Sequence, residues 1–193
     1  MPQSKVQLKH AVDACLKQSP EGDCSNGPHG PIGDWDVSNV ADMSRMFSYA
    51  PLFNGDLSKW DVSSVKDMSS MFLAAKSFNR DLSKWDVSSV VSMAAMFRWA
   101  TSFNSDIAKW DVSSVVNMDY MFLDASSFRR KLCGAAWFYS KATKTIMFEG
   151  SSGSISRRGV CGTTTVATTT VATTQAATTN AGTTVIYNIY ARG

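Results

Sequence analysis

The chain has 193 residues, a formal net charge of +3 and 44% hydrophobic residues, which suits one domain with a sizeable core. It contains no apolar run near the roughly 20 residues of a membrane-spanning helix and no signal-peptide core at its start, so we expect no membrane insertion by this chain. Between residues 32 and 131, eleven Lys or Arg accompany twelve Asp, without a basic stripe of interleaved aromatics, which argues against a nucleic-acid partner.

Residues 1–30 predict an N-terminal cap made of a helix and a turn. Apolar residues at spacings of three and four indicate one buried helical face: Leu8, Ala11, Val12, Cys15 and Leu16. The turn-rich stretch from Ser19 and Pro20 onward ends this pattern. Because an array of repeats exposes its apolar layer at each end, we interpret the helix as its cap.

Residues 31–131 contain four copies of one repeated unit. Each copy begins its shared phrase with a tryptophan, at Trp35, Trp60, Trp85 and Trp110. Self-similarity at a strict period of this size is typical of stacked coils, in which each coil buries its apolar face on its neighbours. We therefore predict that the four tryptophans belong to the structural core.

Each repeat predicts one short strand followed by one short helix. Trp60 and Val62 lie two residues apart, so a strand would bury both and expose Asp61. Downstream apolar residues recur at helical spacing: Val65, Met68, Met71, Phe72 and Ala75. The expected fold class is therefore an α/β solenoid of about four coils.

The residues after the repeats predict a degenerate fifth coil and cap, over 132–160, and a Thr-rich linker or tail, over 161–193. The segment Met147–Ser152 resembles Met121–Ser126 with a shift of 26 residues, so it repeats the end of the previous unit slightly out of register. The tail has the composition of a disordered linker or of an O-glycosylated stalk, although its Thr and Val residues also favour strands.

The cysteines predict two local disulfides that hold the ends of the array. All four lie outside the perfect repeats, as two flanking pairs: Cys15 with Cys24, and Cys133 with Cys161. Free structural thiols are the alternative.

A column of aspartates follows the tryptophans, at Asp36, Asp61, Asp86 and Asp111. Stacked carboxylates repel one another, and calcium could relieve this repulsion. We favour structural bonding to backbone or to the lysines on the same face, Lys59, Lys84 and Lys109. The sequence shows no zinc-site pattern, phosphate loop or nucleophile elbow, so we expect no enzyme activity, cofactor or metal.

Binding specificity is expected where the repeats differ. Four residues on the outward positions of the predicted helices are of the types enriched at interface hot spots: Tyr49, Arg98, Trp99 and Tyr120. They predict a partner-binding patch for a protein or glycan on a monomeric chain. Lateral packing against neighbouring coils is the alternative.

The pattern W-D-V-S-x-V-x-x-M-x-x-M-F, followed by A-x-x-F-N-x-D-L, resembles the BspA-like repeat of surface proteins, a relative of leucine-rich repeats. The resemblance covers about half of the chain and ends where Arg129 and Lys131 replace the expected Asn and Asp. It implies a leucine-rich-repeat-like solenoid, extracellular or cell-surface display, and adhesion or protein binding without catalytic residues. The alternative is a structural spacer module in a longer tandem-repeat protein with Thr-rich stalks.

Overall fold

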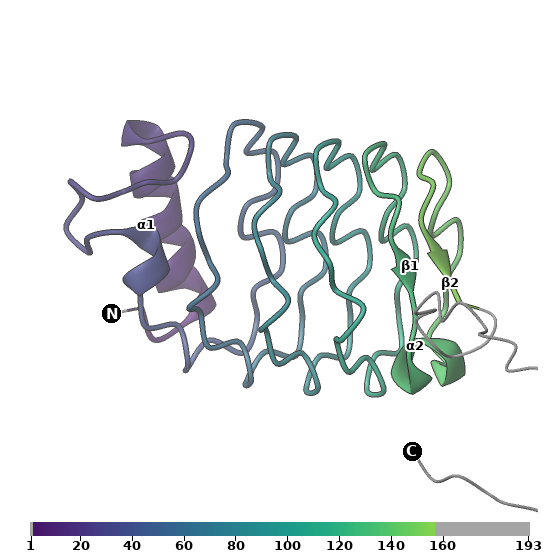
Figure 1. Cartoon of the computed structure of the whole chain (residues 1–193). Coiled ribbons are helices and arrows are strands. Elements are labelled where there is room, and N and C mark those ends of the chain that lie inside the picture. Colours follow the sequence, from purple (N-terminus) through teal and green to yellow (C-terminus); the bar gives the residue numbers. More distant parts are fainter. Residues whose placement is uncertain (1, 157–193) are drawn as a thin grey trace, which may run out of the picture. The chain divides into compact units, whose positions relative to one another are not determined.

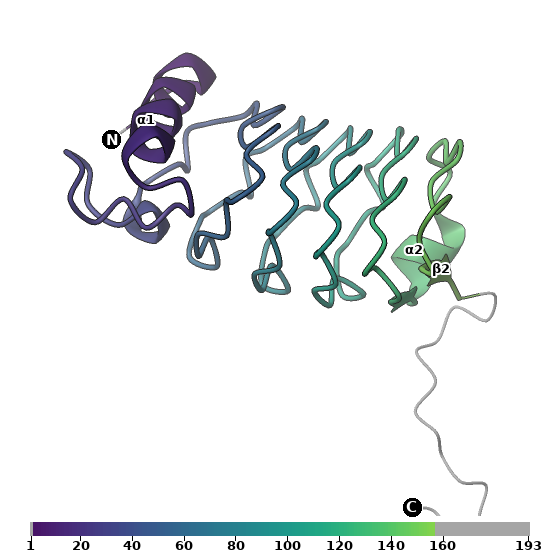
Figure 2. The same cartoon turned by 90° about the horizontal axis from the view of Figure 1, so that it is seen from above.

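The computed structural model describes residues 2–156. Its elements are α1 (Lys5–Gln18), the short 3-10 helix η1 (Ile32–Asp34), β1 (Lys131–Leu132), α2 (Ala135–Tyr139) and β2 (Ser154–Ile155). Between η1 and β1 the chain runs as successive coils that lie side by side, with α1 next to the first coil (Figures 1 and 2). The predicted tail and the end of the predicted C-terminal cap lie outside the described residues.

The helix α1 occupies the predicted N-terminal cap. It begins after Ser4, whose hydroxyl accepts a hydrogen bond from the Gln7 N–H, an N-cap arrangement. Leu8, Val12 and Cys15 form its buried face. The helix meets the first coil through the Lys5 ammonium, whose Nζ lies 2.9 Å from a carboxylate oxygen of Asp42.

The strand and helix predicted within each repeat are absent from the described coils. In their place, residues 43–50 form three overlapping turns, in which Met46, Ser48 and Ala50 each donate a backbone N–H to the carbonyl three residues earlier. We call this stretch and its equivalents 68–75, 93–100, 118–125 and 144–151 the turn segments. Turns of this kind return apolar residues to one side at spacings of three and four, so their pattern resembles that of a helix.

Left-handed backbone prevents a helix in the turn segments. The third and seventh residues of every turn segment have positive φ, for example 60° at Arg45 and 57° at Tyr49. A right-handed helix cannot contain such residues. The remaining residues at these positions are Ser70, Ala74, Ala95, Trp99, Tyr120, Asp124, Ile146 and Gly150.

Hydrogen bonds between coils satisfy the backbone that the turns leave free. In the first four turn segments, the first, third, fifth and seventh N–H groups donate to carbonyls of the next coil; for residues 43–50 these distances are 2.7–2.9 Å. The N–H of Ser44 donates to its neighbour Asp42 instead, over 2.8 Å. Every backbone donor of residues 43–50 is therefore paired, as buried backbone requires. Parallel bridges join the coils just before these segments, from Asp42 through to Thr143.

The core lies inside the coils and repeats with them. The four predicted core tryptophans are at most 4% exposed. The indole N–H groups of Trp60, Trp85 and Trp110 donate over 2.8–3.0 Å to backbone carbonyls 28 residues earlier, whereas that of Trp35 donates to the nearby Gly30 carbonyl. A phenylalanine column stacks with ring centroids 5.5–5.7 Å apart, formed by Phe47, Phe72, Phe97, Phe122 and Phe148.

A fifth turn segment follows the four repeats, with an insertion before it. The bridge from Asn117 to Thr143 spans one residue more than the bridges between the earlier coils. The stretch before this segment also contains α2, which buries Trp137. The strands β1 and β2 then pair in parallel, with Lys131 opposite Ser154 and Leu132 opposite Ile155.

Candidate functional site

Three of the four predicted partner-binding residues come together on neighbouring turn segments. The guanidinium carbon of Arg98 lies 4.1 Å from the ring centroid of Trp99 and 5.9 Å from that of Tyr120. The indole N–H of Trp99 donates to a carboxylate oxygen of Asp124 over 3.1 Å. We call Arg98, Trp99, Tyr120 and Asp124 the aromatic patch.

The aromatic patch combines a cation with two aromatic rings. Stacking of a guanidinium on a tryptophan ring contributes about 0.5–2 kcal/mol. The Nε of Arg98 is buried and has no hydrogen-bond partner within residues 2–156, so this atom is not the one that a partner would meet. The guanidinium and the rings together suit a partner that brings a carboxylate or carbonyl beside an apolar group.

Tyr49 lies apart from the aromatic patch. It belongs to the first turn segment, two coils before Trp99, and its side chain is 67% exposed. It lines a cavity of about 320 Å³ between α1 and the first coil, with Leu16, Pro20 and Leu52. The structure thus divides the four predicted residues between two places.

Sequence reasoning missed Asp124 as a member of the patch. Asp124 stands one full repeat after Trp99, so both occupy the same position in successive turn segments. Residues one period apart are neighbours in a stack of coils. The repeat period was therefore the signal that pairs Trp99 with Asp124.

The aspartate column is bonded to serines two residues later in the sequence. The carboxylates accept the backbone N–H groups over 3.0–3.1 Å, in the pairs Asp36–Ser38, Asp61–Ser63, Asp86–Ser88 and Asp111–Ser113. These turns are of the Asx type. Hydrogen bonds from the serine side chain and backbone hold the pKa of each carboxyl below its usual range.

The lysine partners expected for that column differ in the structure. The ammonium of Lys59 lies 2.7 Å from Asp34, which precedes the repeated phrase, so this lysine pairs outside the aspartate column. The aspartates of the column are thus bonded to serines. Neighbouring carboxylates raise the pKa of Asp61, but to a smaller extent than the serine hydrogen bonds lower it. Backbone bonding was one of the two structural modes that the sequence favoured.

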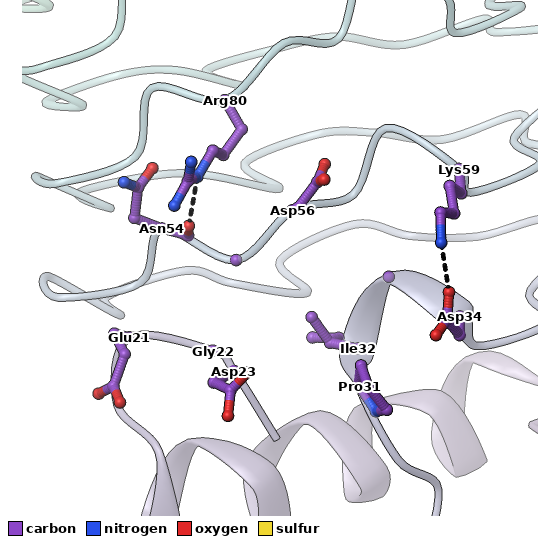
Figure 3. Close-up of a pocket in the computed structure, with 12 residues that line it drawn as sticks. Glu21, Gly22, Asp23, Pro31, Ile32, Asp34, Asn54, Asp56, Lys59 and Arg80 are labelled. Carbon is purple, nitrogen blue, oxygen red and sulfur yellow. Dashed lines mark hydrogen bonds and ion pairs between the residues drawn. The ribbon is translucent and has the colours of Figure 1, made fainter. Parts of the chain in front are cut away.

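A polar pocket lies where the loops after α1 meet the first coils (Figure 3). Its volume is about 390 Å³. The ion pair between Lys59 and Asp34 closes one side, and on the other the Arg80 Nε donates to the Asn54 carbonyl over 2.7 Å. A Cβ on Gly55 would lie 2.9 Å from the Gly22 carbonyl oxygen, so this approach of loop and coil requires glycine. The Lys59–Asp34 pair therefore links η1 to the next coil, and the Arg80–Asn54 bond links two coils.

Among the described residues, no group of three or more His, Cys, Asp or Glu side chains could hold a metal ion. In that same part of the chain, no helix is long and apolar enough to cross a membrane. Cys15 and Cys24 form the disulfide predicted for the N-terminal end, with Cα atoms 5.3 Å apart. The other predicted pair includes Cys161, which lies outside the described residues, and it stays a prediction.

Comparison with known families gives one match. A family model described as "Mycoplasma protein of unknown function, DUF285" matches residues 22–152. This range begins just after α1 and includes all five turn segments. No curated protein and no solved structure matches the chain.

Proposed function

The chain belongs to the DUF285 family of Mycoplasma proteins of unknown function, and from this premise we propose that it is a non-catalytic module that binds a partner protein through the aromatic patch. The single observation that carries the proposal is the stacking of Arg98 on Trp99, at 4.1 Å, beside Tyr120. Arg, Trp and Tyr are the residue types that dominate binding energy at protein interfaces.

The positions of these residues in the repeat also support the proposal. Trp99 and Tyr120 have φ values of 61° and 60°, and the equivalent residues Ala74 and Ala95 have values of 57° and 53°. The repeat therefore accepts a small side chain at these positions, and the aromatic rings are features of this part of the stack rather than requirements of the turn.

We also propose a fold class, a location and a broader role for the chain. We regard the stack of coils as a BspA-like, leucine-rich-repeat-like solenoid that is displayed at a cell surface and acts in adhesion or protein binding. The repeated phrase and the continuous hydrogen bonding between coils support the solenoid class. Surface display rests on the family resemblance of the repeat, and the disulfide at the N-terminal end agrees with an oxidising compartment.

The proposal is tested with an array of purified surface and extracellular proteins and glycans. The wild-type chain is compared with the double variant Trp99→Ala/Tyr120→Ala and with the matched control Tyr49→Ala, which removes an exposed aromatic ring outside the patch. The double variant should bind any true partner at least about tenfold more weakly, and the control should bind like wild type. A partner whose affinity is the same for all three proteins would contradict the proposal. Binding of a glycan through the patch would change the partner class.

A further inference from the structure

The hydrogen bonds that join each coil to the next end at the last described coil, where the equivalent backbone N–H groups have no backbone acceptor among the described residues. In the first four turn segments, alternate N–H groups donate to the next coil over 2.7–2.9 Å. The equivalent donors of the fifth segment are the N–H groups of Lys144, Ile146, Phe148 and Gly150. None of these four has a backbone acceptor in the part of the chain that the structure describes.

The fifth segment has the conformation needed to continue the ladder. Ile146 and Gly150 have φ values of 53° and 70°, which repeat the left-handed positions of every earlier segment. Phe148 ends the phenylalanine column and stacks only on the preceding side within the described residues, 5.5 Å from Phe122. Both the backbone and the column therefore stop at a surface that matches the surface between any two coils.

One backbone carbonyl at this surface already accepts a hydrogen bond. In the earlier coils, a carbonyl just before the turn segment accepts an N–H from the next coil, as Val91 does from Val116 over 2.8 Å. The equivalent carbonyl of the last coil belongs to Ala142, and it accepts instead from the ammonium of Lys144 over 2.8 Å. The surface therefore presents N–H donors, and a segment that binds there must supply carbonyl acceptors.

We propose that this surface, formed by Lys144, Ile146, Phe148 and Gly150, docks a polypeptide segment of a partner that adopts the turn conformation of the repeat. The segment presents backbone carbonyls at alternate residues and a phenylalanine that stacks on Phe148. Backbone hydrogen bonds supply the affinity, as in the addition of a strand to a sheet edge, and the side-chain column supplies the register. This inference concerns a surface other than the aromatic patch and does not depend on the proposed function.

Two arrangements of a second copy of the chain fit this surface poorly. A two-fold symmetric pair would bring the same surface together, so that donors would face donors. A head-to-tail pair would need the acceptor edge of the first coil, where Lys5 of α1 bonds to the side chains of Asp42 and Ser44. The disulfide between Cys15 and Cys24 holds α1 to the loop that follows it. Among separate molecules, these contacts favour a segment of another protein over a second copy of the chain.

Amide hydrogen exchange of the full chain, followed by NMR, tests the proposal. The probe is a synthetic peptide with the sequence of residues 66–78, which contains one turn segment and Phe72. In the free chain, the amides of Lys144, Ile146, Phe148 and Gly150 should exchange at least about tenfold faster than those of the equivalent residues in the fourth segment. Saturating peptide should slow these four amides by about tenfold or more.

Matched controls separate this docking from non-specific adsorption. A peptide with Phe72→Ala should bind more weakly, and one of scrambled order should leave the exchange unchanged. Phe148→Ala in the chain should weaken binding, whereas Phe138→Ala, which removes a ring in α2 that is 41% exposed, should not. Two results would overturn the proposal. The first is amide exchange at these four residues that the peptide does not slow. The second is protection of the four amides in the free chain. In that case, sedimentation would distinguish a bound second copy from cover by the same chain.

Discussion

Individual residues of the turn segments hold the backbone in a conformation that their side chains disfavour. The left-handed region costs about 1–2 kcal/mol for most L-residues and little for glycine. Only Asp124 and Gly150, among the residues at these positions, belong to the types that tolerate it well. In the first four segments, hydrogen bonds to the next coil hold this conformation, so the strain is local and a single substitution can relieve it at one residue.

Ala95→Gly should therefore stabilise the chain or leave its stability unchanged. Ala95 has a φ of 53°, so relief of strain offsets the greater flexibility of glycine in the unfolded chain. The matched control is Ala94→Gly, next to it at negative φ, which should destabilise by about 0.5–1 kcal/mol. Urea unfolding measures both free energies. Equal losses in the two variants would contradict the assigned backbone at Ala95.

The aspartate column should make stability sensitive to acid. Because serine hydrogen bonds lower the pKa of Asp86 and its equivalents in the folded chain, their stabilising effect is present above the usual aspartate value of 3.8. It is lost as the pH falls through the lower, folded pKa. Unfolding by urea from about pH 5 to about pH 2 measures this loss.

Replacement of the serine hydroxyls tests the cause of that acid sensitivity. A variant with alanine at Ser38, Ser63, Ser88 and Ser113 keeps the backbone N–H bonds but removes those of the side chains. Its stability should fall less over the same pH range than that of wild type. An identical pH dependence in the two proteins would exclude the hydroxyls as the cause.

At the scale of elements, α1 differs from the coils in how it is held. The coils are joined by backbone bonds, whereas α1 relies on a buried face of Leu8 and Val12, the Lys5–Asp42 ion pair and the disulfide. The two cysteines lie close in sequence, and closing a short loop of this kind stabilises by roughly 2–3 kcal/mol.

Removal of the disulfide should loosen α1. Cys15→Ser/Cys24→Ser is expected to lower the free energy of unfolding by roughly 2–3 kcal/mol and to speed amide exchange in α1 before that of the coils. The control is Ala14→Ser, on the exposed face of the same helix, with an effect within about 0.5 kcal/mol. An unchanged urea midpoint in the double variant would contradict the role of the disulfide.

The elements also show what the sequence can and cannot predict. The period identified which residues are buried, because equivalent positions in stacked coils have equivalent neighbours. The period did not identify the backbone conformation, because Val65, Met68 and Phe72 have the same spacing in overlapping turns as in a helix. The distinction depends on φ at Ser70 and Ala74, and neither residue type signals the left-handed region. The sequence predicted that Arg98, Trp99 and Tyr120 lie on one surface. Tyr49 lies apart from them because it is two repeats away from Trp99 in the sequence.

At the scale of the whole molecule, the described part is a series of like layers in which each contacts its neighbours. The cost of losing a core side chain should therefore depend on whether it has one neighbouring layer or two. Phe97 is fully buried and stacks on both Phe72 and Phe122, whereas Phe148 is half-buried and stacks on the preceding layer.

Phe97→Ala should destabilise by about 3–5 kcal/mol, and Phe148→Ala by about half of that. Urea unfolding gives both values, and amide exchange shows whether Phe148→Ala opens the last layer alone. A greater loss from Phe148→Ala than from Phe97→Ala would show that the stability of the stack is not shared between neighbouring layers.

The direction of the hydrogen bonds between coils gives the stack an electrostatic polarity. In the turn segments that lie between two others, alternate peptide groups have their N–H toward the following coil and their C=O toward the preceding one. Each peptide group has a dipole of about 3.5 D, and these dipoles add along the stack, whereas they largely cancel in an ordinary sheet. The α1 end is therefore the negative pole, where the Lys5 ammonium lies beside Asp42. The end at Lys144 to Gly150 is the positive pole, and it favours electron-rich groups such as carbonyl oxygens.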